Sequence, residues 1–428
     1  MKEHWVKNFD ALATNPTRTQ ALTILESGFD VIQTKRVIQE NVTVTGDAIE
    51  VRGQKFDAHA FKDIYLVGFG KGACAAVYEL YTILNTRLKK TVVIDRTILT
   101  TCPAEIEAFV GTHPLPSDAN VQATKAVIGV AEAAEADDLV LVVVAGGGSS
   151  LLCSSDEERE ANVRLFKEFE RVGADIRELN TVRKHISKLK GGGLAEMLYP
   201  ATVVGLVFSD IVGGNPEEVA SGPTYMDQST NADAEAILGR FKLEDGYVLH
   251  ETPKEKKYFE KVTNIVLISN EDAIRAMADT AETLGYESLI LKEPLYEFPG
   301  PALAKIFEQS AAGRAVFAGG EVQLQVPQDH GTGGRCQFLA MEALRALGPD
   351  DVFVAAASDG RDNSDEAGAI VDNGTIERIA ELNIDLAPYR ARLDTIPVFN
   401  KTGDSITTGT LEANVSDWYF LLTPPHTV

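Results

Sequence analysis

Membrane and export signals are missing from this sequence. No apolar run in its 428 residues approaches the roughly 20 residues that a membrane-spanning helix needs. Residues 1–5 lack the apolar core and cleavage site of a signal peptide. The four cysteines have no paired spacing and the seven histidines form no cluster with them, so neither a disulfide framework nor a transition-metal site is expected. These absences predict a cytoplasmic protein that does not associate with membranes.

Positive charge is also scarce. The chain has 40 lysines and arginines against 63 aspartates and glutamates, a net charge of −23, which disfavours nucleic acid and anionic membranes as partners. An anionic ligand would need positive charge gathered in one place, and residues 183–190 supply it, because five of these eight are basic. We interpret the segment as an anion site rather than a solvated surface, and expect that removing Arg183 or Lys190 weakens ligand binding without unfolding the protein. The candidate ligands for substrate or nucleotide are Asn180, Arg183, Lys184, His185, Lys188 and Lys190.

Short apolar runs and amphipathic segments alternate from residue 64 onward. This order predicts an α/β fold whose first domain is a doubly wound, Rossmann-like sheet with helices on both faces. The chain becomes polar over 227–261, so we predict two domains, 1–235 and a smaller α/β domain of 236–428, with the final strand at 418–422 left unassigned between them. Expected strands are 64–67, 91–95, 139–144, 202–208, 264–269, 286–291, 314–318 and 352–357, and expected helices are 20–40, 72–88, 157–171, 181–199, 270–284, 301–311 and 336–347.

The strand expected at 139–144 runs directly into three glycines and two serines. Glycine lets the backbone approach a ligand closely and turn successive N–H groups toward one point, and serine hydroxyls add donors. We interpret this loop as a cradle for a phosphate or carboxylate; a tight strand-to-helix turn without a ligand is the alternative. The candidate residues are Gly146, Gly147, Gly148, Ser149 and Ser150.

A second glycine turn follows the first expected strand. Gly68, Gly70 and Ala73 satisfy the dinucleotide-binding pattern G-x-G-x-x-G/A. With Asp95 at the end of the next strand to bind ribose hydroxyls, the pattern points to a nicotinamide enzyme. Lys71 lies inside the turn, where a cation could instead touch a phosphate. The residues leave open a dinucleotide site, a phosphate contact by Lys71 and a purely structural turn.

A third glycine loop brings Gly333 and Gly334 before Arg335 at an expected helix N-terminus. The helix dipole disfavours a cation there by some tenths of a kcal/mol, and the same holds for Lys71. Nothing in the local sequence requires either cation, so each suggests a compensating anion. We therefore expect that removing either one lowers turnover and leaves stability unchanged or slightly higher.

Carboxylates follow three expected strands, at Asp210, Glu321 and Asp359. Open α/β sheets bind ligands at the carboxyl ends of their strands, and Mg²⁺ needs few protein ligands beside substrate phosphates. We interpret these three residues as candidate Mg²⁺ ligands. Helix caps and turn aspartates are the alternative.

Nine segments in this order resemble the type II glycerate kinase family, whose C-terminal part is called the MOFRL domain. The resemblance covers roughly residues 60 to 422. The chain departs from the family at Gly213-Gly214-Asn215, at Cys336 in place of an asparagine, and over 402–410. The segments are GFGKGA (68–73), THPLPSDAN (112–120), AGGGSSLL (145–152), LNTVRKHISKLKGGGLA (179–195), FSDIVGGNPEEVASGPT (208–224), AGGE (318–321), GTGGRCQFLAMEAL (331–344), ASDGRDNSDEAGAIVD (357–372) and TG…NVSD (402–417).

The resemblance implies phosphorylation of D-glycerate to 2-phosphoglycerate with ATP and Mg²⁺, in a cleft between two α/β domains, and it allows a homodimer. The family's lysine of the GxGK turn matches Lys71 and its GGR arginine matches Arg335, and both are proposed to act in transfer. Asp210 is our candidate for the base that takes the proton of the acceptor hydroxyl. The alternatives are a kinase of a related sugar acid, an NAD(P)-dependent hydroxypyruvate reductase and a non-catalytic anion-binding module.

Overall fold

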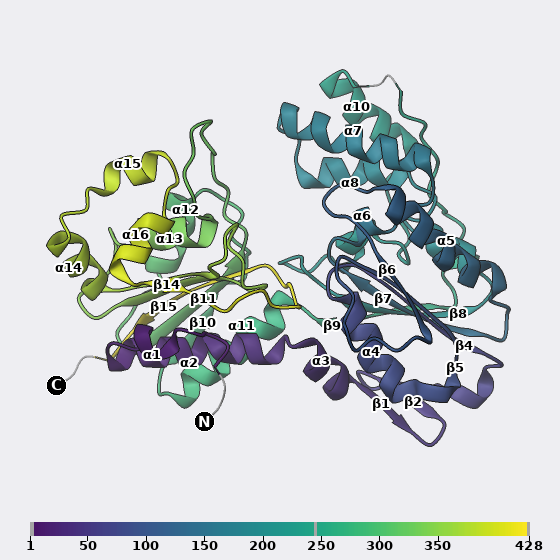
Figure 1. Ribbon diagram of the computed structural model, residues 1–428, viewed down its shortest axis with the longest axis horizontal. Coiled ribbons are helices and arrows are strands. Elements are labelled where there is room, and N and C mark those ends of the chain that lie inside the picture. Colours follow the sequence, from purple (N-terminus) through teal and green to yellow (C-terminus); the bar gives the residue numbers. More distant parts are fainter. Residues whose placement is uncertain (1–3, 244–245, 426–428) are drawn as a thin grey trace. The chain divides into compact units, whose positions relative to one another are not determined.

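The chain forms two compact units in the computed structural model (Figure 1), which describes residues 4–243 and 246–425. Among these residues, no helix is both long and apolar enough to cross a membrane. Unit 1 contains Met1–Gln33, Val212–Gly214 and Ser269–Val428, and unit 2 contains Thr34–Ile211 and Asn215–Ile268.

Unit 2 is built on six parallel strands in the order β6-β5-β4-β7-β8-β9. The order runs outward in both directions from the neighbours β4 and β7, so the sheet is doubly wound and Rossmann-like, as predicted. The strand expected at 264–269 is β9, which pairs with β8 in this sheet and not with the strands of the C-terminal unit. Its apolar pattern predicts a strand but does not specify which sheet it joins. The strands are β4 (Ile64–Phe69), β5 (Leu88–Asp95), β6 (Ile106–Val110), β7 (Leu139–Ala145), β8 (Thr202–Phe208) and β9 (Val262–Ile268).

Helices cover both faces of this sheet. Helix α4 (Ala73–Leu84) packs on one face so closely that a Cβ at Gly68 would lie 2.4 Å from Val77 Cγ2. Val67 points to the other face, where it packs with α5 (Asp118–Ala133) and α9 (Gly193–Leu198). The other elements of unit 2 are α3 (Thr34–Asn41), β1 (Val42–Thr45), β2 (Ala48–Val51), β3 (Gln54–Asp57), η1 (Ala58–Ala60), η2 (Asn85–Arg87), α6 (Gly148–Leu151), α7 (Asp156–Val172), α8 (Ile176–His185), η3 (Pro216–Ser221), α10 (Asn231–Phe241) and η4 (Lys256–Tyr258).

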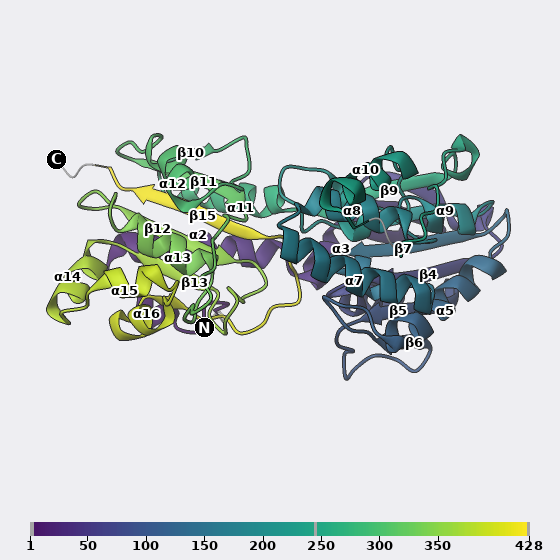
Figure 2. The ribbon, with the colours of Figure 1, turned by 90° about the horizontal axis from the view of Figure 1, so that it is seen from above.

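Unit 1 is built on a mixed sheet in the order β10-β11-β15-β12-β13-β14. The final strand, β15 (Asp417–Thr423), is central in this sheet and antiparallel to both neighbours, and Figure 2 shows it as a yellow arrow. The strand left unassigned by the sequence is therefore in the C-terminal unit. Because β11 and β12 both oppose β15, they are parallel and end at one edge. The other strands are β10 (Glu287–Ile290), β11 (Arg314–Gly320), β12 (Val352–Ala357), β13 (Gly368–Val371) and β14 (Ser405–Ile406).

Two helical layers enclose the sheet of unit 1. Helices α2 (Pro16–Val31) and α11 (Asn270–Thr283) pack together, and Phe29 of α2 meets Trp418 of β15 with ring centroids 5.1 Å apart. On the other face, Tyr419 packs with Leu339 of α13 (Arg335–Ala343) and with α12 (Pro299–Phe307). The remaining helices are α1 (Phe9–Leu12), α14 (Asn373–Glu381), α15 (Leu386–Ala391) and α16 (Ile396–Thr402).

Two expected helices are each broken in the structure. The segment 20–40 becomes α2 and α3, which belong to different units. The segment 181–199 becomes α8, which ends at His185, and α9, which begins after Gly192; Gly191 and Gly192 have φ of +56° and +93°, values that a continuous helix cannot contain. The compact units also divide the chain differently from the predicted boundary at 235/236: residues 236–268 lie in unit 2, whose sheet β9 completes.

Candidate active site

Two predicted loops meet at the switch point of the unit 2 sheet. Gly70 and Lys71 follow β4 and Gly146 follows β7, and the Lys71 N–H donates to the Gly146 carbonyl at 2.8 Å. Open α/β sheets bind ligands at this point, because the loops of the two neighbouring strands diverge and leave a crevice. The lysine of the glycine turn and the predicted anion cradle therefore belong to one site.

The first two glycines of the cradle have no room for a side chain. A Cβ on Gly146 would lie 2.0 Å from Asp210 Oδ2, and a Cβ on Gly147 would lie 2.9 Å from His113 Cδ2. Gly147 also has φ of +76°, which favours glycine. Asp210, which follows β8, thus lies directly against the cradle, as does the ring of His113.

Of the other three cradle residues, Gly148 and Ser150 have structural roles, and Ser149 is available to bind a ligand. A Cβ on Gly148 would lie 2.7 Å from Ala220 Cβ, so this residue serves close packing. Ser150 is buried, and its hydroxyl donates to the Pro114 carbonyl at 2.5 Å. The Ser149 side chain is half-buried and faces the arginine described next. Ser149 is therefore the hydroxyl of this loop that a ligand can reach.

Arg183 is the buried cation of this site. It is 7% exposed and lies in the last turn of α8, where the helix dipole favours positive charge. Its Nη1 donates to Asn180 Oδ1 at 3.1 Å and to Ser149 Oγ at 3.4 Å. Among the described residues its Nε has no hydrogen-bond partner and no carboxylate pairs with it, and burial lowers its pKa to about 10. A buried guanidinium with only neutral partners can bind an anion.

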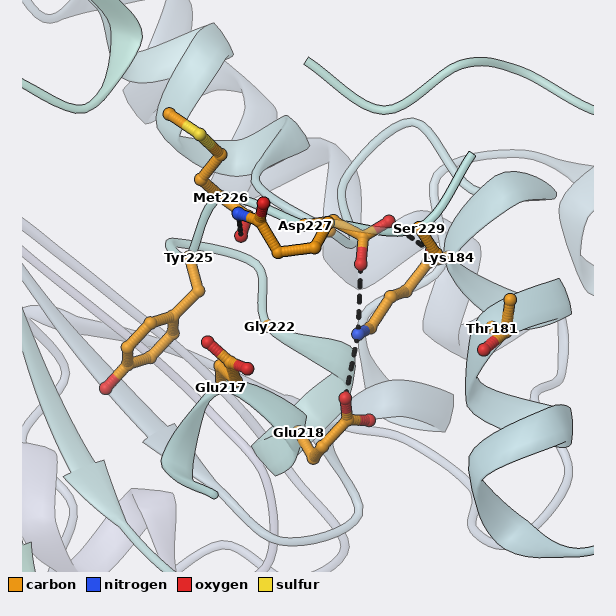
Figure 3. A pocket seen from close by; sticks show the side chains of 11 residues that line it. Thr181, Lys184, Glu217, Glu218, Gly222, Tyr225, Met226, Asp227 and Ser229 are labelled. Carbon is orange, nitrogen blue, oxygen red and sulfur yellow. Dashed lines mark hydrogen bonds and ion pairs between the residues drawn. The ribbon is translucent and has the colours of Figure 1, made fainter. Parts of the chain in front are cut away.

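Lys184 lies on the wall of a cavity of about 170 Å³ (Figure 3), but its ammonium is paired inside the protein. Nζ lies 2.9 Å from Glu218 Oε1 and 3.2 Å from Asp227 Oδ1. Burial acts to lower the pKa of Lys184, but the two carboxylates outweigh it and raise the pKa. Glu217 also lines the cavity. With more carboxylates than cations in its wall, this cavity does not suit an anion.

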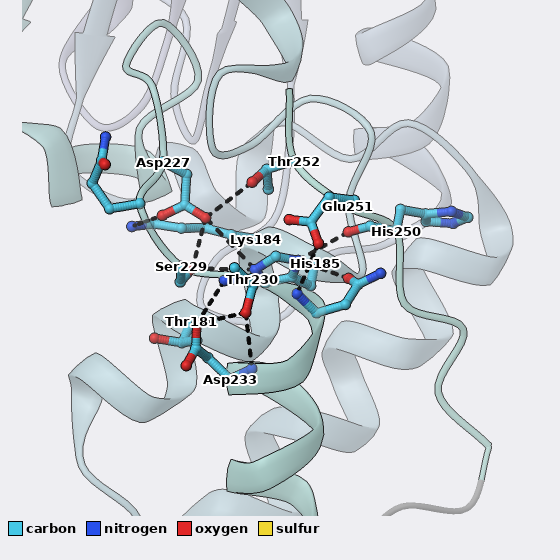
Figure 4. Close-up of polar contacts among 12 residues, drawn as sticks. Thr181, Lys184, His185, Asp227, Ser229, Thr230, Asp233, His250, Glu251 and Thr252 are labelled. Atoms are coloured by element: carbon cyan, nitrogen blue, oxygen red, sulfur yellow. Dashed lines mark hydrogen bonds and ion pairs between the residues drawn. The ribbon is translucent and has the colours of Figure 1, made fainter. Parts of the chain in front are cut away.

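His185 is part of a polar network that joins α8 to the segments after it (Figure 4). Its side chain is fully buried, with Nδ1 2.9 Å from the His250 carbonyl and Nε2 3.1 Å from Ser229 Oγ. Asp227 accepts hydrogen bonds from Ser229 and Thr252 in the same network. His185 therefore holds the fold of unit 2 together and is occupied by internal partners.

Lys190 and Lys188 complete the predicted basic segment. Lys190 Nζ lies 2.6 Å from Glu158 Oε1, and both side chains are almost wholly buried. Lys188 is exposed on the surface. Of the six candidates in this part of the chain, the structure brings Arg183 and Asn180 to the cradle and places the others elsewhere.

Sequence reasoning did not select His113, although it lies at this site. The residue is half-buried, and burial lowers its pKa to about 4, together with the nearby charges of Lys71, Arg96 and Arg183. The motif 112–120 contains it, but the preceding strand β6 was not recognised, so its place at the sheet edge could not be deduced. Recognition of the end of β6 would have placed His113 at the site, whereas its residue type alone did not.

The carboxylate of Asp95 is not available to bind a ribose, because backbone N–H groups already occupy it. Asp95 is 2% exposed, its Oδ2 accepts the Cys74 N–H at 2.9 Å and its Oδ1 accepts the Arg96 N–H at 2.6 Å. Burial raises its pKa to about 6. The carboxylate therefore caps the start of α4, which removes the acidic residue that the dinucleotide interpretation requires.

A second group of charged residues lies in unit 1, at the edge where β11 and β12 end. Arg335 opens α13, and its Nε lies 2.5 Å from Asp417 Oδ2 while Nη2 lies 3.1 Å from Glu321 Oε1. We expected a ligand to supply the anion that compensates Arg335, but the protein supplies one itself, because β15 brings Asp417 from far along the chain. The expectation that removal of Arg335 leaves stability unchanged or slightly higher does not fit this ion pair. Burial raises the pKa of Asp417 to about 7, although Arg335 acts in the opposite direction. Burial acts to lower the pKa of Arg335, but Asp417 and Glu321 raise it.

The glycines before Arg335 pack tightly and border a cavity. A Cβ on Gly333 would lie 1.9 Å from Thr395 Oγ1, and one on Gly334 would lie 2.0 Å from the Asp362 carbonyl oxygen. Both glycines line a cavity of about 670 Å³, a volume typical of small-molecule sites. Asp362 caps α13 by accepting the N–H groups of the two residues after Arg335, and burial raises its pKa to about 6.

The predicted Mg²⁺ ligands do not form one cluster. Within residues 4–243 and 246–425, no group of three histidine, cysteine or acidic side chains could hold a metal ion by itself. Asp210 lies in unit 2, whereas Glu321 and Asp359 lie in unit 1, where Glu321 is paired with Arg335. Mg²⁺ commonly uses one or two carboxylates and completes its shell with phosphates and water. Single carboxylates at a sheet edge fit that mode of binding.

Comparison with known proteins places these residues in a family. The model of a domain of unknown function, DUF4147, matches residues 20–255, more than half of the chain, and that of the MOFRL family matches residues 314–417. A D-glycerate 2-kinase of Thermotoga maritima is 32% identical over 379 residues, covering 83% of this chain and 89% of that protein. The chain belongs to the glycerate 2-kinase (MOFRL) family.

A solved structure agrees on the fold, and a further relative is similar in sequence. The crystal structure of glycerate kinase from Thermotoga maritima superposes with a TM-score of 0.81 at 27% identity, covering 95% of this chain and 99% of that one. A protein of Agrobacterium vitis, provisionally named a hydroxypyruvate reductase, is 32% identical over 381 residues. The alignment covers 82% of this chain and 97% of that protein. The DUF4147 match contains Lys71, Arg183 and Asp210, and the MOFRL match contains Arg335.

Proposed function

We propose that this protein phosphorylates D-glycerate with ATP and releases 2-phosphoglycerate. The observation that supports this best is Arg183, a buried guanidinium with only neutral partners beside the Gly146–Ser150 loop. A buried cation without a counter-charge is costly unless an anion binds to it. Membership of the family supplies the substrate class, because glycerate carries a carboxylate that such a guanidinium can hold.

Each residue of the site is assigned a role from what it contacts. Arg183, Asn180 and Ser149 hold the carboxylate of glycerate beside the N–H groups of the glycine loop. Lys71, and Arg335 from the other unit, are proposed to neutralise negative charge on the phosphoryl group during transfer. Phosphoryl transfer depends on positioning and charge neutralisation more than on covalent help, so cations are the groups that this reaction requires.

The nucleotide is proposed to bind against Gly333 and Gly334, whose cavity of about 670 Å³ has room for it. Asp210, Glu321 and Asp359 are the proposed ligands for Mg²⁺. When bound, Mg²⁺ neutralises phosphate charge. We place the reaction in the cytoplasm, because the four cysteines are free thiols.

A paired assay tests the proposal against its alternatives. One arm follows ADP release from ATP and Mg²⁺ with D-glycerate and identifies the product by ³¹P NMR, and the other follows NADH oxidation with hydroxypyruvate. ADP release with 2-phosphoglycerate as product supports the proposal, and NADH oxidation alone supports the reductase. Activity in neither arm leaves a non-catalytic anion-binding module. Faster turnover of a longer sugar acid would make the protein a kinase of that substrate instead.

Lys71→Met and Arg335→Met separate a catalytic cation from a structural one. Each should lower kcat by about 10²–10³-fold, as loss of one preorganised charge does, with smaller changes in KM. The Lys71 side chain pairs with no described carboxylate, so its variant should keep the wild-type melting temperature. Arg335→Met should also destabilise the protein, by about 1–3 kcal/mol, because the buried Asp417 then loses its cationic partner and keeps the hydrogen bond from Tyr419. Exposed Arg275→Met is the control, and near-wild-type kcat in either variant would remove that residue from the reaction.

A further inference from the structure

His113 occupies an unusual position in the candidate active site. Its ring lies against the glycine loop, with Cδ2 2.9 Å and Nε2 3.2 Å from the place where a Cβ on Gly147 would stand. Within the described part of the chain, neither ring nitrogen has a hydrogen-bond partner in the protein. A half-buried imidazole that faces an anion site and makes no hydrogen bond is available to bind a proton or a ligand.

The charges around His113 are almost all positive. Lys71 comes from the loop after β4, Arg96 from the loop after β5 and Arg183 from α8, and all three act on its ring. Two carboxylates also lie near the loop: Asp95, which caps α4, and Asp210, which lies against Gly146, the glycine next to the one that His113 faces. The imidazole therefore remains neutral while the site is empty, because burial and three cations oppose its protonation.

We propose that His113 is the base that accepts the proton of the glycerate hydroxyl during phosphoryl transfer. The inference rests on the proposed function and replaces Asp210 as the candidate base. The hydroxyl O–H bond breaks and its proton moves to a ring nitrogen of His113. The hydroxyl oxygen forms a bond to the γ-phosphorus of ATP, the bond from that phosphorus to the β–γ bridging oxygen breaks, and the electron pair leaves with ADP. The imidazolium then releases its proton to water.

Substrate binding controls the strength of this base. The carboxylate of glycerate and the phosphates of ATP offset the charges of Lys71 and Arg183, so His113 becomes a stronger base only when the site is filled. A base near the working pH is the most effective. Asp210 is a poorer candidate, because it is a proposed Mg²⁺ ligand, and a carboxylate that binds the metal is not available to take the proton of the hydroxyl.

NMR titration of the imidazole tests the coupling without relying on turnover. With histidine labelled at its ring carbons, the His113 resonance, assigned by its loss in His113→Gln, should titrate near pH 4 in the free protein. Saturating D-glycerate should move the midpoint upward by at least one pH unit. The resonance of His59, an exposed residue outside the site, should not move. An unchanged His113 midpoint in the presence of bound D-glycerate would overturn the proposal.

Kinetics supply the second measurement. His113→Gln should lower kcat by about 10²–10⁴-fold, the usual contribution of general base catalysis, with less effect on KM, and should abolish the acid limb of the kcat profile. Asp210→Asn should keep that limb, and His59→Gln should behave like the wild type. A His113→Gln variant with wild-type kcat overturns the role of His113 alone, whereas a wild-type protein that does not phosphorylate D-glycerate overturns the proposed function itself.

Discussion

At the scale of single residues, charge alone does not reveal which cations bind a ligand. Arg183 and Lys190 belong to one basic segment, and both are buried. Lys190 pairs with Glu158, whose pKa is lowered: burial acts to raise it, but Lys190 and two serines outweigh that effect. Arg183 has only Asn180 and Ser149. The charge of Lys190 is therefore neutralised within the protein, whereas the charge of Arg183 requires an anionic ligand to neutralise it.

Matched methionine variants should separate the two cations. Arg183→Met should raise KM for D-glycerate at least tenfold and leave the free energy of unfolding unchanged or higher, because it removes an unbalanced buried charge. Lys190→Met should lower the free energy of unfolding by about 3–5 kcal/mol, because Glu158 stays buried without its partner. The earlier expectation that Lys190 could be removed without unfolding the protein does not fit this ion pair. Urea denaturation and steady-state kinetics measure both effects, and equal stability losses in the two variants would contradict the distinction.

At the scale of elements, one buried side chain joins the loops that form the unit 2 site. Asn120 in the first turn of α5 is wholly buried. Its Oδ1 accepts the N–H groups of Thr112 and Ser117, and its Nδ2 donates to the carbonyls of Thr112 and Ser150, all within 3.1 Å. The loop that carries His113 and the end of the glycine cradle are thus fixed by the same amide.

Asn120→Ala should loosen both loops together. We expect a loss of about 2–4 kcal/mol in the free energy of unfolding, because several backbone groups lose their partner at once, and a fall in kcat as the site loses its geometry. Gly129→Ala on the same helix is the matched control: nothing lies within 4 Å of its new Cβ, so it should stabilise by about 0.5–1 kcal/mol. Calorimetry and urea denaturation measure these changes. If Asn120→Ala is as stable as the wild type, the amide does not anchor the site.

At the scale of the whole molecule, buried carboxylates with raised pKa values set a pH dependence of stability. Burial raises the pKa of Asp95 and Asp362 to about 6 and that of Asp417 to about 7. Between the ordinary aspartate pKa near 4 and these values, the folded state binds more protons than the unfolded state. For these groups, the free energy of unfolding therefore falls as pH rises from about 4 to 7. His113 acts in the opposite sense up to about pH 6.5, because its folded pKa is lowered.

Asp95→Asn isolates one of these contributions. The amide oxygen can still cap α4 but does not titrate, so the stability of the variant relative to wild type should increase by about 2 kcal/mol between pH 4.5 and pH 7.5. Contributions of other groups, including His113, cancel in this difference. Exposed Asp279→Asn is the control for loss of one charge. Urea denaturation at four pH values measures the difference, and parallel curves for Asp95→Asn and wild type would contradict the raised pKa.

Most of the unit 2 sheet could be predicted from its apolar runs, because a strand buried on both faces is recognisable from its own residues. The assignment of β9 to this sheet could not, since strand pairing depends on distant segments. The break of segment 20–40 into α2 and α3 was also missed, because both halves are amphipathic and their different units are a property of packing. The glycines at 191 and 192 did carry a local signal that the segment 181–199 is not one helix, because they stand directly before α9.

The local sequence was enough to predict the elements at the switch point, the glycine loops and the cations Lys71, Arg183 and Arg335, because backbone conformation and residue chemistry are local properties. Which of these cations can bind a ligand depends instead on the folded structure. Glu158 and Asp227 neutralise two lysines of the basic segment, and Asp417 reaches Arg335 from 82 residues away. Whether a charge is balanced depends on partners brought together by folding, because electrostatic energy depends on distance and burial and not on position along the chain.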